Sequence, residues 1–529
     1  MNDFLNCLKG QNRKRNGLLY ICILFLFIQC LFLIYFNLTR DIHTIDRDSA
    51  EVFVHAMEMW RNKKVLIPDW TYTTTLEWDC SLLLAVPLYG ITGNVYLSFG
   101  LANLCFVAVW IWVLFLVFER RRILCSVLCA NFLLIPYTVG QLDYFNMMFF
   151  NGGQYVIKAI LPVMLIALLT GELKKQGRLV IQRAVLLALY SVLLLINSFS
   201  SGVYVFLCGL IPVLAAYLLY KMYHQEGIVL RYYIYAGLTA GLVIIGYGMN
   251  LWAAIHAKGN GMTLCPATEL ADNCIANFLG MFELFGGLAY ESTPVLSYQG
   301  ICILVRMGFV WVLLGFGLYA VFKIFRKKSD IRVCLFLAIF IWNLFVISIC
   351  ETRYGATSEY RYHLIGMIPL LCVAVNEFVG WFEGVEQRYA KRLLTCICMV
   401  FLAVMNVTAW RKALDYNTNT IKYQKICEYA NMQGAGMVYF LRDTKGANIC
   451  RLLDNGSYGL AYVVADHTGQ SQYRVYVHDY YAKYNMQEIL FDNTFLVLDT
   501  ERFDFGDEVE MFDHQYHLVN MIENYGIYQ

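Results

Sequence analysis

The chain has 529 residues, of which 59% are hydrophobic and 15% are charged, and its mean hydropathy is +0.52. Because soluble globular proteins carry about 25% charged residues, this composition excludes an ordinary soluble protein. The net charge of +2 averages two unlike parts: residues 411–529 hold 10 Lys and Arg against 16 Asp and Glu, whereas the rest of the chain is basic. We therefore expect a polytopic membrane domain over residues 1–410 and a small acidic domain over residues 411–529.

About eleven apolar segments have the length of a membrane-spanning helix, roughly 17–25 residues. They lie near residues 17–36, 95–118, 123–139, 154–171, 183–198, 201–220, 232–256, 300–322, 332–350, 362–380 and 392–410. A shorter run at 80–92 is interrupted by Pro87, which predicts a juxtamembrane or re-entrant helix instead of a span. The first segment lacks a small-x-small cleavage site before Asn37, so we interpret it as a membrane anchor and not as a signal peptide.

The basic residues between these segments predict the orientation in the membrane. With eleven spans, one side receives all the clusters: Arg13–Arg15, Arg120–Arg122, Lys174–Arg178, Lys221, Lys323–Lys328 and Lys391–Arg392. The positive-inside rule makes that side the cytoplasm, so the N-terminus is cytoplasmic and the C-terminal domain is extracytoplasmic. Four polar loops then lie outside, at 37–94, 140–153, 256–299 and 350–362. The compact loops favour a plasma membrane over an endoplasmic reticulum.

The first external loop, residues 37–94, concentrates carboxylates beside the first span. They include Asp41, Asp46, Asp48, Glu51, Glu77 and Asp79. Residues 48–60 have apolar side chains at helical spacing, which predicts a helix on the membrane surface with Asp48 at its N-terminal end. Asp48 alone could be a simple helix cap, but so many charges near hydrocarbon are costly and usually functional. Oxygen ligands of this kind suit hard cations, so Asp48 and Glu77 could hold Mg²⁺ or Mn²⁺.

Two later external stretches hold further candidate residues. Asp143 ends the stretch 137–143 and is an isolated carboxylate at a membrane interface. Arg361 precedes a late span, and a guanidinium there can bind a phosphate through two hydrogen bonds. The alternative for Arg361 is an interfacial arginine that only extends its head group towards water. Arg353 and Lys158 are further candidates for binding phosphate.

The first loop resembles that of the C-type (GT-C) membrane glycosyltransferases, most closely the branch of protein O-mannosyltransferases and lipid A aminoarabinose transferases. Asp48, Pro68 and Glu77 match the branch's first Asp, its Pro and its second Glu in order and spacing. The chain departs from the pattern at Ser49, where the branch has Glu, and at Trp78-Asp79, where it has Lys-Pro. The stretches 137–143 and 360–369 are similar to two further motifs of the same branch.

This resemblance implies a GT-C-like α-helical polytopic membrane glycosyltransferase. Its donor would be a sugar linked to polyprenyl phosphate, and its acceptor an extracytoplasmic cell-envelope glycan, lipid or protein. The implied base is Asp48, with Asp46 and Asp143 as further catalytic candidates; Glu77 and Asp79 would orient the acceptor or a metal ion. The implied phosphate-binding residues are Arg361, Arg353 and Lys158. Partners are then the lipid bilayer, the donor and the acceptor; no nucleic acid is expected, and no cofactor other than the divalent cation.

Two alternatives stay open. A transporter or a flippase for lipid-linked glycans also buries charged residues in a many-spanning bundle, often with internal repeats. We find no repeat between the halves of the chain, and acids gathered in one loop favour an interfacial enzyme. The second alternative is a non-catalytic envelope-assembly protein of the same fold.

The acidic tail predicts a small α/β domain. Strands are expected at 436–441, 474–478 and 495–498, and a helix at 421–432. No nucleophile elbow, phosphate loop or metal motif is present in it, so we expect an accessory lid or recognition domain. In the polar external loop 256–299 of the membrane domain, Cys265 and Cys274 could form a disulfide or stay reduced.

Overall fold

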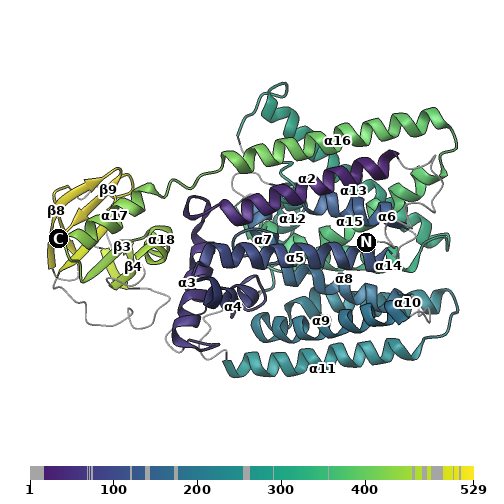
Figure 1. Cartoon of the computed structure of the whole chain (residues 1–529), viewed down its shortest axis with the longest axis horizontal. Coiled ribbons are helices and arrows are strands. Elements are labelled where there is room, and N and C mark those ends of the chain that lie inside the picture. Colours follow the sequence, from purple (N-terminus) through teal and green to yellow (C-terminus); the bar gives the residue numbers. More distant parts are fainter. Residues whose placement is uncertain are drawn as a thin grey trace.

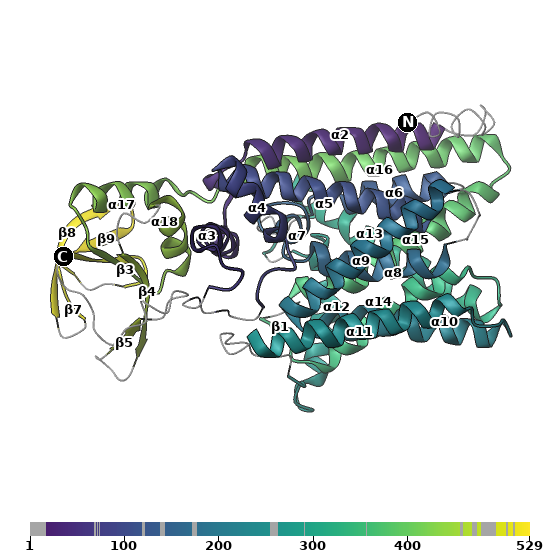
Figure 2. The same ribbon diagram turned by 60° about the horizontal axis from the view of Figure 1, so that its bottom comes forward.

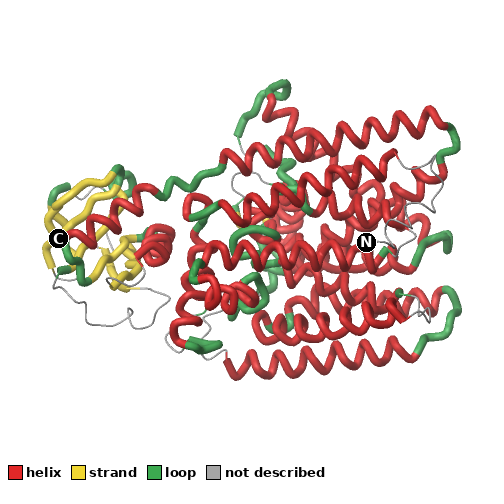
Figure 3. The backbone as a smooth tube through the Cα atoms, viewed as in Figure 1, coloured by secondary structure: helices red, strands yellow, loops and turns green. Residues whose placement is uncertain are grey.

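The computed structural model describes residues 17–67, 70, 72, 75–118, 122–137, 143–171, 177–253, 263–289, 291–355, 357–454, 459–467, 473–477, 493–503, 506–511 and 514–529. Pro68 and the basic clusters at 13–15, 120–121 and 174–175 lie outside these residues. A bundle of long helices is followed by a small sheet domain at one end (Figure 1), and the longer strands all belong to that domain (Figure 3). We call the end of the bundle next to the sheet domain the domain end.

Nine helical segments in the described part of the chain are long and apolar enough to cross a membrane. They are α2 (Gly17–Thr39), α5 (Val95–Val117), α9 (Gly177–Ser201), η3 with α10 (Phe206–Tyr223), α11 (Leu230–Ala253), α13 (Tyr298–Phe325), α14 (Ile331–Ile349), η5 with α15 (Tyr360–Gly384) and α16 (Arg388–Asp415). The other two predicted segments form the shorter helices α6 (Ile123–Leu133) and α8 (Val156–Thr170). All eleven segments are therefore helical at least in part, while the count of eleven spans stays a prediction.

Short helices fill the domain end. They are α3 (Arg47–Asn62), α4 (Leu82–Thr92), α7 (Asp143–Met148) and α12 (Leu270–Leu284), with the hairpin β1 (Arg353–Tyr354) and β2 (Thr357–Ser358). Helix α4 has 11 residues and contains Pro87, so it is too short to cross a bilayer, as predicted. Cys265 and Cys274 are free thiols in the structure.

The bundle is held together by close helix contacts at small residues, because lipid offers no hydrophobic driving force between helices. At Gly100 of α5, a Cβ atom would lie only 1.8 Å from the backbone oxygen of Asn37 in α2. Asn37 in turn accepts a hydrogen bond from Asn103 Nδ2 (3.0 Å), so the two helices share a polar contact at the same level.

We expect Gly100→Val to destabilise the protein by about 1–3 kcal/mol, because the new side chain must push α2 and α5 apart. Thermal unfolding in detergent measures the loss. Gly248→Val in α11 is the matched control, since a Cβ atom there meets nothing within 4 Å. Equal melting temperatures for the two variants would contradict the close contact.

The C-terminal domain contains a mixed sheet with the order β5-β4-β3-β6-β9-β8-β7. Its elements are α17 (Ile421–Met432), β3 (Met437–Leu441), α18 (Thr444–Asp454), β4 (Gly459–His467), β5 (Tyr473–Val477), β6 (Thr494–Asp499), β7 (Glu508–Met511), β8 (His514–Ile522) and β9 (Tyr525–Tyr528). β3 is parallel to β4 and β6, and the other pairs are antiparallel. The predicted helix and three strands are present, and the α/β class is confirmed.

The interior strand β3 is buried on both faces. Val438 and Phe440 pack with the cluster that includes α17 and α18, whereas Met437, Tyr439 and Leu441 pack into a second cluster on the other face. This division follows from the alternation of side chains along a strand. Helices α17 and α18 cover the first face (Figure 2).

Helix α3 joins the two parts of the molecule. Its Phe53 and Val54 belong to the same apolar cluster as Ala447 and Ile449 of α18, and α3 also packs on α4 (Figure 2). The expectation of a helix with one apolar face on the membrane surface is therefore corrected. Every residue of α3 from Ser49 to Met57 is buried, because the C-terminal domain covers the side that would otherwise face water.

Candidate active site

The first-loop acids are positioned by the start of α3. Asp46 caps this helix: its Oδ1 accepts a hydrogen bond from the backbone N–H of Ser49 (2.8 Å), and its Oδ2 accepts one from Asn146 Nδ2 of α7 (2.8 Å). Burial raises the pKa of Asp46. Asp46 and not Asp48 is thus the helix cap, and it ties α3 to α7.

Asp48 lies in the first turn of α3 with 49% of its side chain exposed. The nearest ion-pair contact joins its Oδ1 to Arg47 Nε at 3.9 Å, a long contact between two exposed groups. The negative charge of Asp48 interacts electrostatically with Glu77 and with the Arg361 guanidinium. Asp48 is therefore an accessible carboxylate that lies near a second acid and a guanidinium.

Glu77 is held by a histidine that the sequence did not point to. His55, fully buried in the middle of α3, has its Nδ1 2.8 Å from Glu77 Oε2 and its Nε2 3.3 Å from the Tyr72 hydroxyl. Its ring stacks on Trp70 with centroids 4.7 Å apart. The backbone of Glu77 has a φ of 62°, a left-handed conformation that non-glycine residues rarely adopt.

Burial sets the protonation of this pair. It lowers the pKa of His55 to about 3 and raises the pKa of Glu77, to which the charge of Asp48 adds. Both groups are then neutral: the protonated Glu77 donates to Nδ1, and Nε2–H donates to the Tyr72 oxygen. The Tyr72 oxygen also accepts a hydrogen bond from the backbone N–H of Ile67 (3.2 Å), so the chain of donors and acceptors is consistent.

The raised pKa of Glu77 predicts a pH dependence of stability. In the native state Glu77 keeps a proton that the unfolded chain has already released, so its contribution falls as pH rises above the ordinary glutamate range. Between the ordinary glutamate pKa and the raised pKa of about 8, we expect the melting temperature of Glu77→Gln to decline less with rising pH than that of the wild type. Glu428→Gln, an exposed acid of α17, is the control and should decline like the wild type. Parallel curves for Glu77→Gln and the wild type would contradict a neutral Glu77.

Asp79 and Lys158 form a buried ion pair of 2.9 Å. Asp79 also accepts hydrogen bonds from Asn197 (2.6 Å), Ser200 (2.8 Å) and Ser201 (2.8 Å), all at the end of α9. Lys158 Nζ in addition donates to the backbone oxygen of Gln154 (3.0 Å). The pair therefore fixes the first loop to α8 and α9, and both charges act on Glu77.

The remaining predicted residues lie on other elements of the domain end. Asp143 begins α7, and its charge acts on Tyr360, Lys412 and Tyr416. Arg361 in η5 has its Nε 2.8 Å from Glu359 Oε2. Arg353 Nη1 is 3.3 Å from Asp272 Oδ2 of α12.

Two groups of predicted residues are thus brought together by charge interactions. In the first group, Glu77 interacts electrostatically with Asp48, Asp79 and Lys158. Asp48 also interacts electrostatically with Arg361. In the second, Asp46 and Asp143 both act on Tyr416, whose pKa is raised first by burial and then by their charges. Arg353 instead forms an ion pair with Asp272 of α12.

Solved structures with the same arrangement identify the fold. ArnT from Cupriavidus metallidurans matches with a TM-score of 0.52 and 10% identity, over 96% of this chain and 97% of that chain. The archaeal oligosaccharyltransferase AglB from Archaeoglobus fulgidus, in complex with an inhibitory peptide and a dolichol-phosphate, matches with a TM-score of 0.51 and 10% identity, over 91% and 70%. This chain has the GT-C fold. Neither a protein-family model nor a curated protein sequence matches it.

The resemblance predicted from the sequence is therefore confirmed for the fold. The GT-C chain is an α-helical polytopic membrane protein with a small C-terminal α/β domain. The alignment with ArnT extends over both parts, since it spans 96% of the residues. At 10% identity the likeness carries the fold only, so the roles of individual residues stay proposals.

The same acids are the candidate ligands of a metal ion. Within the described residues no group of three His, Cys, Asp or Glu side chains could hold an ion. Asp79 already accepts from four donors, Asp46 from two, and Glu77 bonds to His55. The described acids Asp46, Glu77 and Asp79 of the first loop are thus engaged by donors of the protein itself, and the divalent cation at Asp48 and Glu77 stays a prediction. A second matching structure of the A. fulgidus oligosaccharyltransferase is a complex with Zn and sulfate (TM-score 0.50, 10% identity, over 90% of this chain and 68% of that chain).

Proposed function

We propose that this protein is a glycosyltransferase that moves a sugar from a polyprenyl-phosphate-linked donor to an extracytoplasmic acceptor. The fold supports this, because the matching structures are named as an oligosaccharyltransferase and ArnT. The observation that carries it is that the accessible carboxylate of Asp48 interacts electrostatically with the buried Glu77 and with the Arg361 guanidinium. The domain end then faces the extracytoplasmic side of the plasma membrane, and the N-terminus the cytoplasm.

In the proposed reaction the acceptor hydroxyl attacks the anomeric carbon of the sugar. Asp48 takes the hydroxyl proton as general base, the new bond forms from the hydroxyl oxygen to the anomeric carbon, and the bond from that carbon to the phosphate oxygen breaks. One displacement of this kind inverts the anomeric configuration. Arg361 stabilises the negative charge of the departing lipid phosphate.

The neutral His55–Glu77 pair supports Asp48 in this role. A protonated Glu77 carries no charge, so it adds no like-charge repulsion to a carboxylate at Asp48. A protonated Glu77 can also orient the acceptor or the sugar through hydrogen bonds. Asp46 and Asp143, which both interact electrostatically with Tyr416, remain candidate catalytic acids. Arg353 and Lys158 remain candidate phosphate ligands. Asp79 would hold Lys158 in place. A divalent cation bound to Asp48 and Glu77 would add charge stabilisation, and no step depends on it.

A donor screen tests the function. Protein purified into lipid vesicles receives radiolabelled polyprenyl-phosphate sugars together with a cell-envelope extract, and transfer of label to the extract is measured. The proposal expects transfer from at least one donor. Movement of a solute across the vesicle membrane without consumption of any donor would instead identify a transporter, and binding without transfer would identify an assembly protein of the same fold.

A further inference from the structure

Two buried thiols meet between helices α17 and α18 of the C-terminal domain. Cys427 Sγ lies 3.8 Å from the backbone oxygen of Cys450, and Cys450 Sγ lies 3.7 Å from the backbone oxygen of Tyr423, one turn before Cys427. The two thiol groups are also in hydrogen-bond contact with each other. Each side chain therefore reaches the turn of the opposite helix from which its partner projects.

Nothing in the sequence relates these two cysteines, which lie 23 positions apart on different helices. The candidate pair in the sequence is Cys265 and Cys274, which share one polar loop. All four residues are thiols in the structure. The fold thus adds a second candidate pair, in the domain that follows the bundle.

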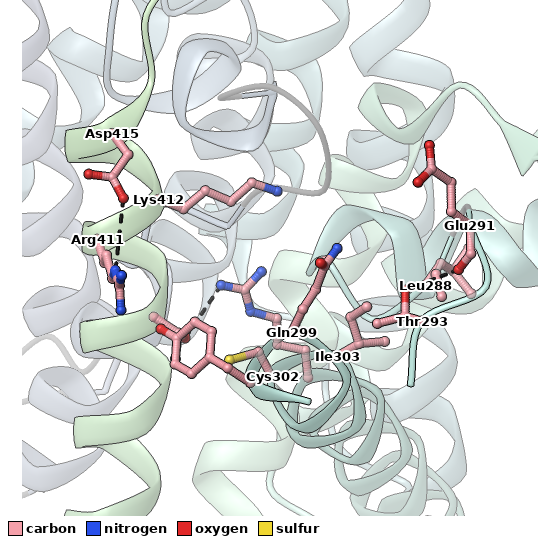
Figure 4. A pocket seen from close by; sticks show the side chains of 14 residues that line it. Leu288, Glu291, Thr293, Gln299, Cys302, Ile303, Arg411, Lys412 and Asp415 are labelled. Atoms are coloured by element: carbon pink, nitrogen blue, oxygen red, sulfur yellow. Dashed lines mark hydrogen bonds and ion pairs between the residues drawn. The ribbon is translucent and has the colours of Figure 1, made fainter. Parts of the chain in front are cut away.

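Two comparisons show what a disulfide needs besides a cysteine. Cys129 of α6 and Cys372 of α15 are in contact, but both are buried inside the helix bundle, which folds in the bilayer away from aqueous oxidants. Cys302 of α13 lines a cavity of about 580 Å³ between α13, α16 and the loop before α13 (Figure 4). No second cysteine is among the described residues of this lining, so Cys302 can be reached but has no thiol beside it there.

The C-terminal domain combines both conditions. It is predicted to fold outside the cytoplasm. Disulfides form and persist in oxidising extracytoplasmic compartments, whereas cytosolic thiols are kept reduced. In the alternative interpretation, Cys427 and Cys450 are two small buried hydrophobic residues. That interpretation explains their burial but not why each side chain is directed at the other.

We infer that Cys427 and Cys450 form a disulfide when the C-terminal domain folds outside the cytoplasm. The oxidant is an external disulfide, of a small thiol or of a thiol–disulfide oxidoreductase. One cysteine thiolate attacks it, which forms a mixed disulfide and releases one thiolate; the second cysteine thiolate attacks the mixed disulfide, forms the Cys427–Cys450 bond and releases the other. Two electrons pass from the protein to the oxidant, and the two protons of the protein thiols end on the released thiols.

The burial of the two cysteines sets the order of events. Both belong to the apolar cluster that also contains Ile426 and Ile449. Burial raises the pKa of Cys450 well above the ordinary thiol value, so the folded domain disfavours the reactive thiolate. Exchange therefore precedes the final packing of α17 on α18, and the completed bond is protected from external thiols.

The bond would stabilise the surface against which α3 packs. Phe53 and Val54 of α3 belong to the same apolar cluster as the two cysteines, and α18 packs on both α3 and α17. A crosslink between positions 427 and 450 lowers the conformational entropy of the unfolded domain. It therefore favours the packed arrangement of α17 and α18 beside the helix that carries Asp48.

Peptide mapping of the full-length wild-type protein tests the bond without any variant. Cells are lysed directly in denaturant with N-ethylmaleimide, so that no bond forms during preparation, and the isolated protein is digested with trypsin. We expect residues 426–442 to be linked to residues 446–451, and a reductant to separate the two peptides. Cys302 is the internal control and should be alkylated in the same sample. Complete alkylation of Cys427 and Cys450 would overturn the inference.

Thermal unfolding in detergent, with and without dithiothreitol, is the second measurement. Since the reductant reaches the bond as the domain opens, we expect it to lower the melting temperature of the wild type by about 5 °C or more. Cys427→Ala should melt at the same temperature with and without reductant. Cys265→Ala is the matched control and should keep the full shift. A shift that persists in Cys427→Ala and disappears in Cys265→Ala would assign the disulfide to the loop 256–299 and overturn the inference.

The disulfide depends on the predicted orientation of the chain and not on sugar transfer. Linked peptides from a protein that transfers no sugar from any donor would refute the proposed function alone. Sugar transfer by a protein in which both cysteines are fully alkylated would refute this inference alone.

Discussion

Asp48→Asn is expected to abolish sugar transfer while the protein stays folded. The carboxylate is half exposed and its contact with Arg47 is long, so its loss should change stability by no more than about 0.5 kcal/mol. An amide cannot take up the acceptor proton, and removal of a general base typically costs about 10²–10⁴-fold in rate. Initial rates of transfer from the labelled donor, measured beside thermal unfolding, give both quantities.

Substitutions of other acids distinguish a loss of catalysis from a loss of stability. Asp507→Asn changes an exposed aspartate of the C-terminal domain and should keep full activity. Asp46→Ala should lower the melting temperature instead, because the loss of a helix cap costs about 1 kcal/mol and Asp46 also accepts from Asn146. Full activity of both Asp48→Asn and Asp143→Asn would show that these acids are not the base.

The membrane architecture was predictable from the sequence because it depends on one local property. A spanning helix needs an apolar run of about 20 residues, and each of the eleven runs contains a helix in the structure. The extra strands of the C-terminal domain were not predictable in this way. Strand β8, for example, has His514, Gln515, His517 and Asn520 among its nine residues and is buried on one face only, so its strand signal is weak.

Most residues of the candidate site could be predicted from the sequence, but the contacts between them could not. The first-loop acids were found because carboxylates beside a span are rare, yet nothing in the sequence relates Asp79 to Lys158, which lies 79 positions later. His55 was missed for a different reason. The C-terminal domain buries the side of α3 opposite the bundle, so the apolar stripe of an amphipathic helix does not show which residues are internal. The structural role of His55 can be assigned only from its contacts with Glu77 and Tyr72.

The fold and the charge pattern together suggest how the two parts cooperate. The linker after α16 is tied to the first loop, because Thr418 N–H donates to the His43 backbone oxygen (2.8 Å) and the Thr420 hydroxyl is 2.9 Å from His43 Nδ1. Helix α3 is then packed between the bundle and α18. The C-terminal domain therefore packs against the helix that carries Asp48, and its role as an accessory lid or recognition domain stays a prediction.

Lys158→Met is expected to destabilise the protein by about 3–5 kcal/mol, the range for removal of one partner from a buried ion pair. Asp79 is fully buried and would keep a charge without its counter-ion, although Asn197, Ser200 and Ser201 still donate to it. The double variant Lys158→Met with Asp79→Asn should therefore be more stable than Lys158→Met alone, because the unpaired charge is gone. Lys425→Met, which breaks an exposed pair with Glu523, should cost no more than about 1 kcal/mol. If Lys158→Met instead melts like the wild type and loses only donor binding, Lys158 serves the substrate phosphate and not the anchoring of the first loop to α8.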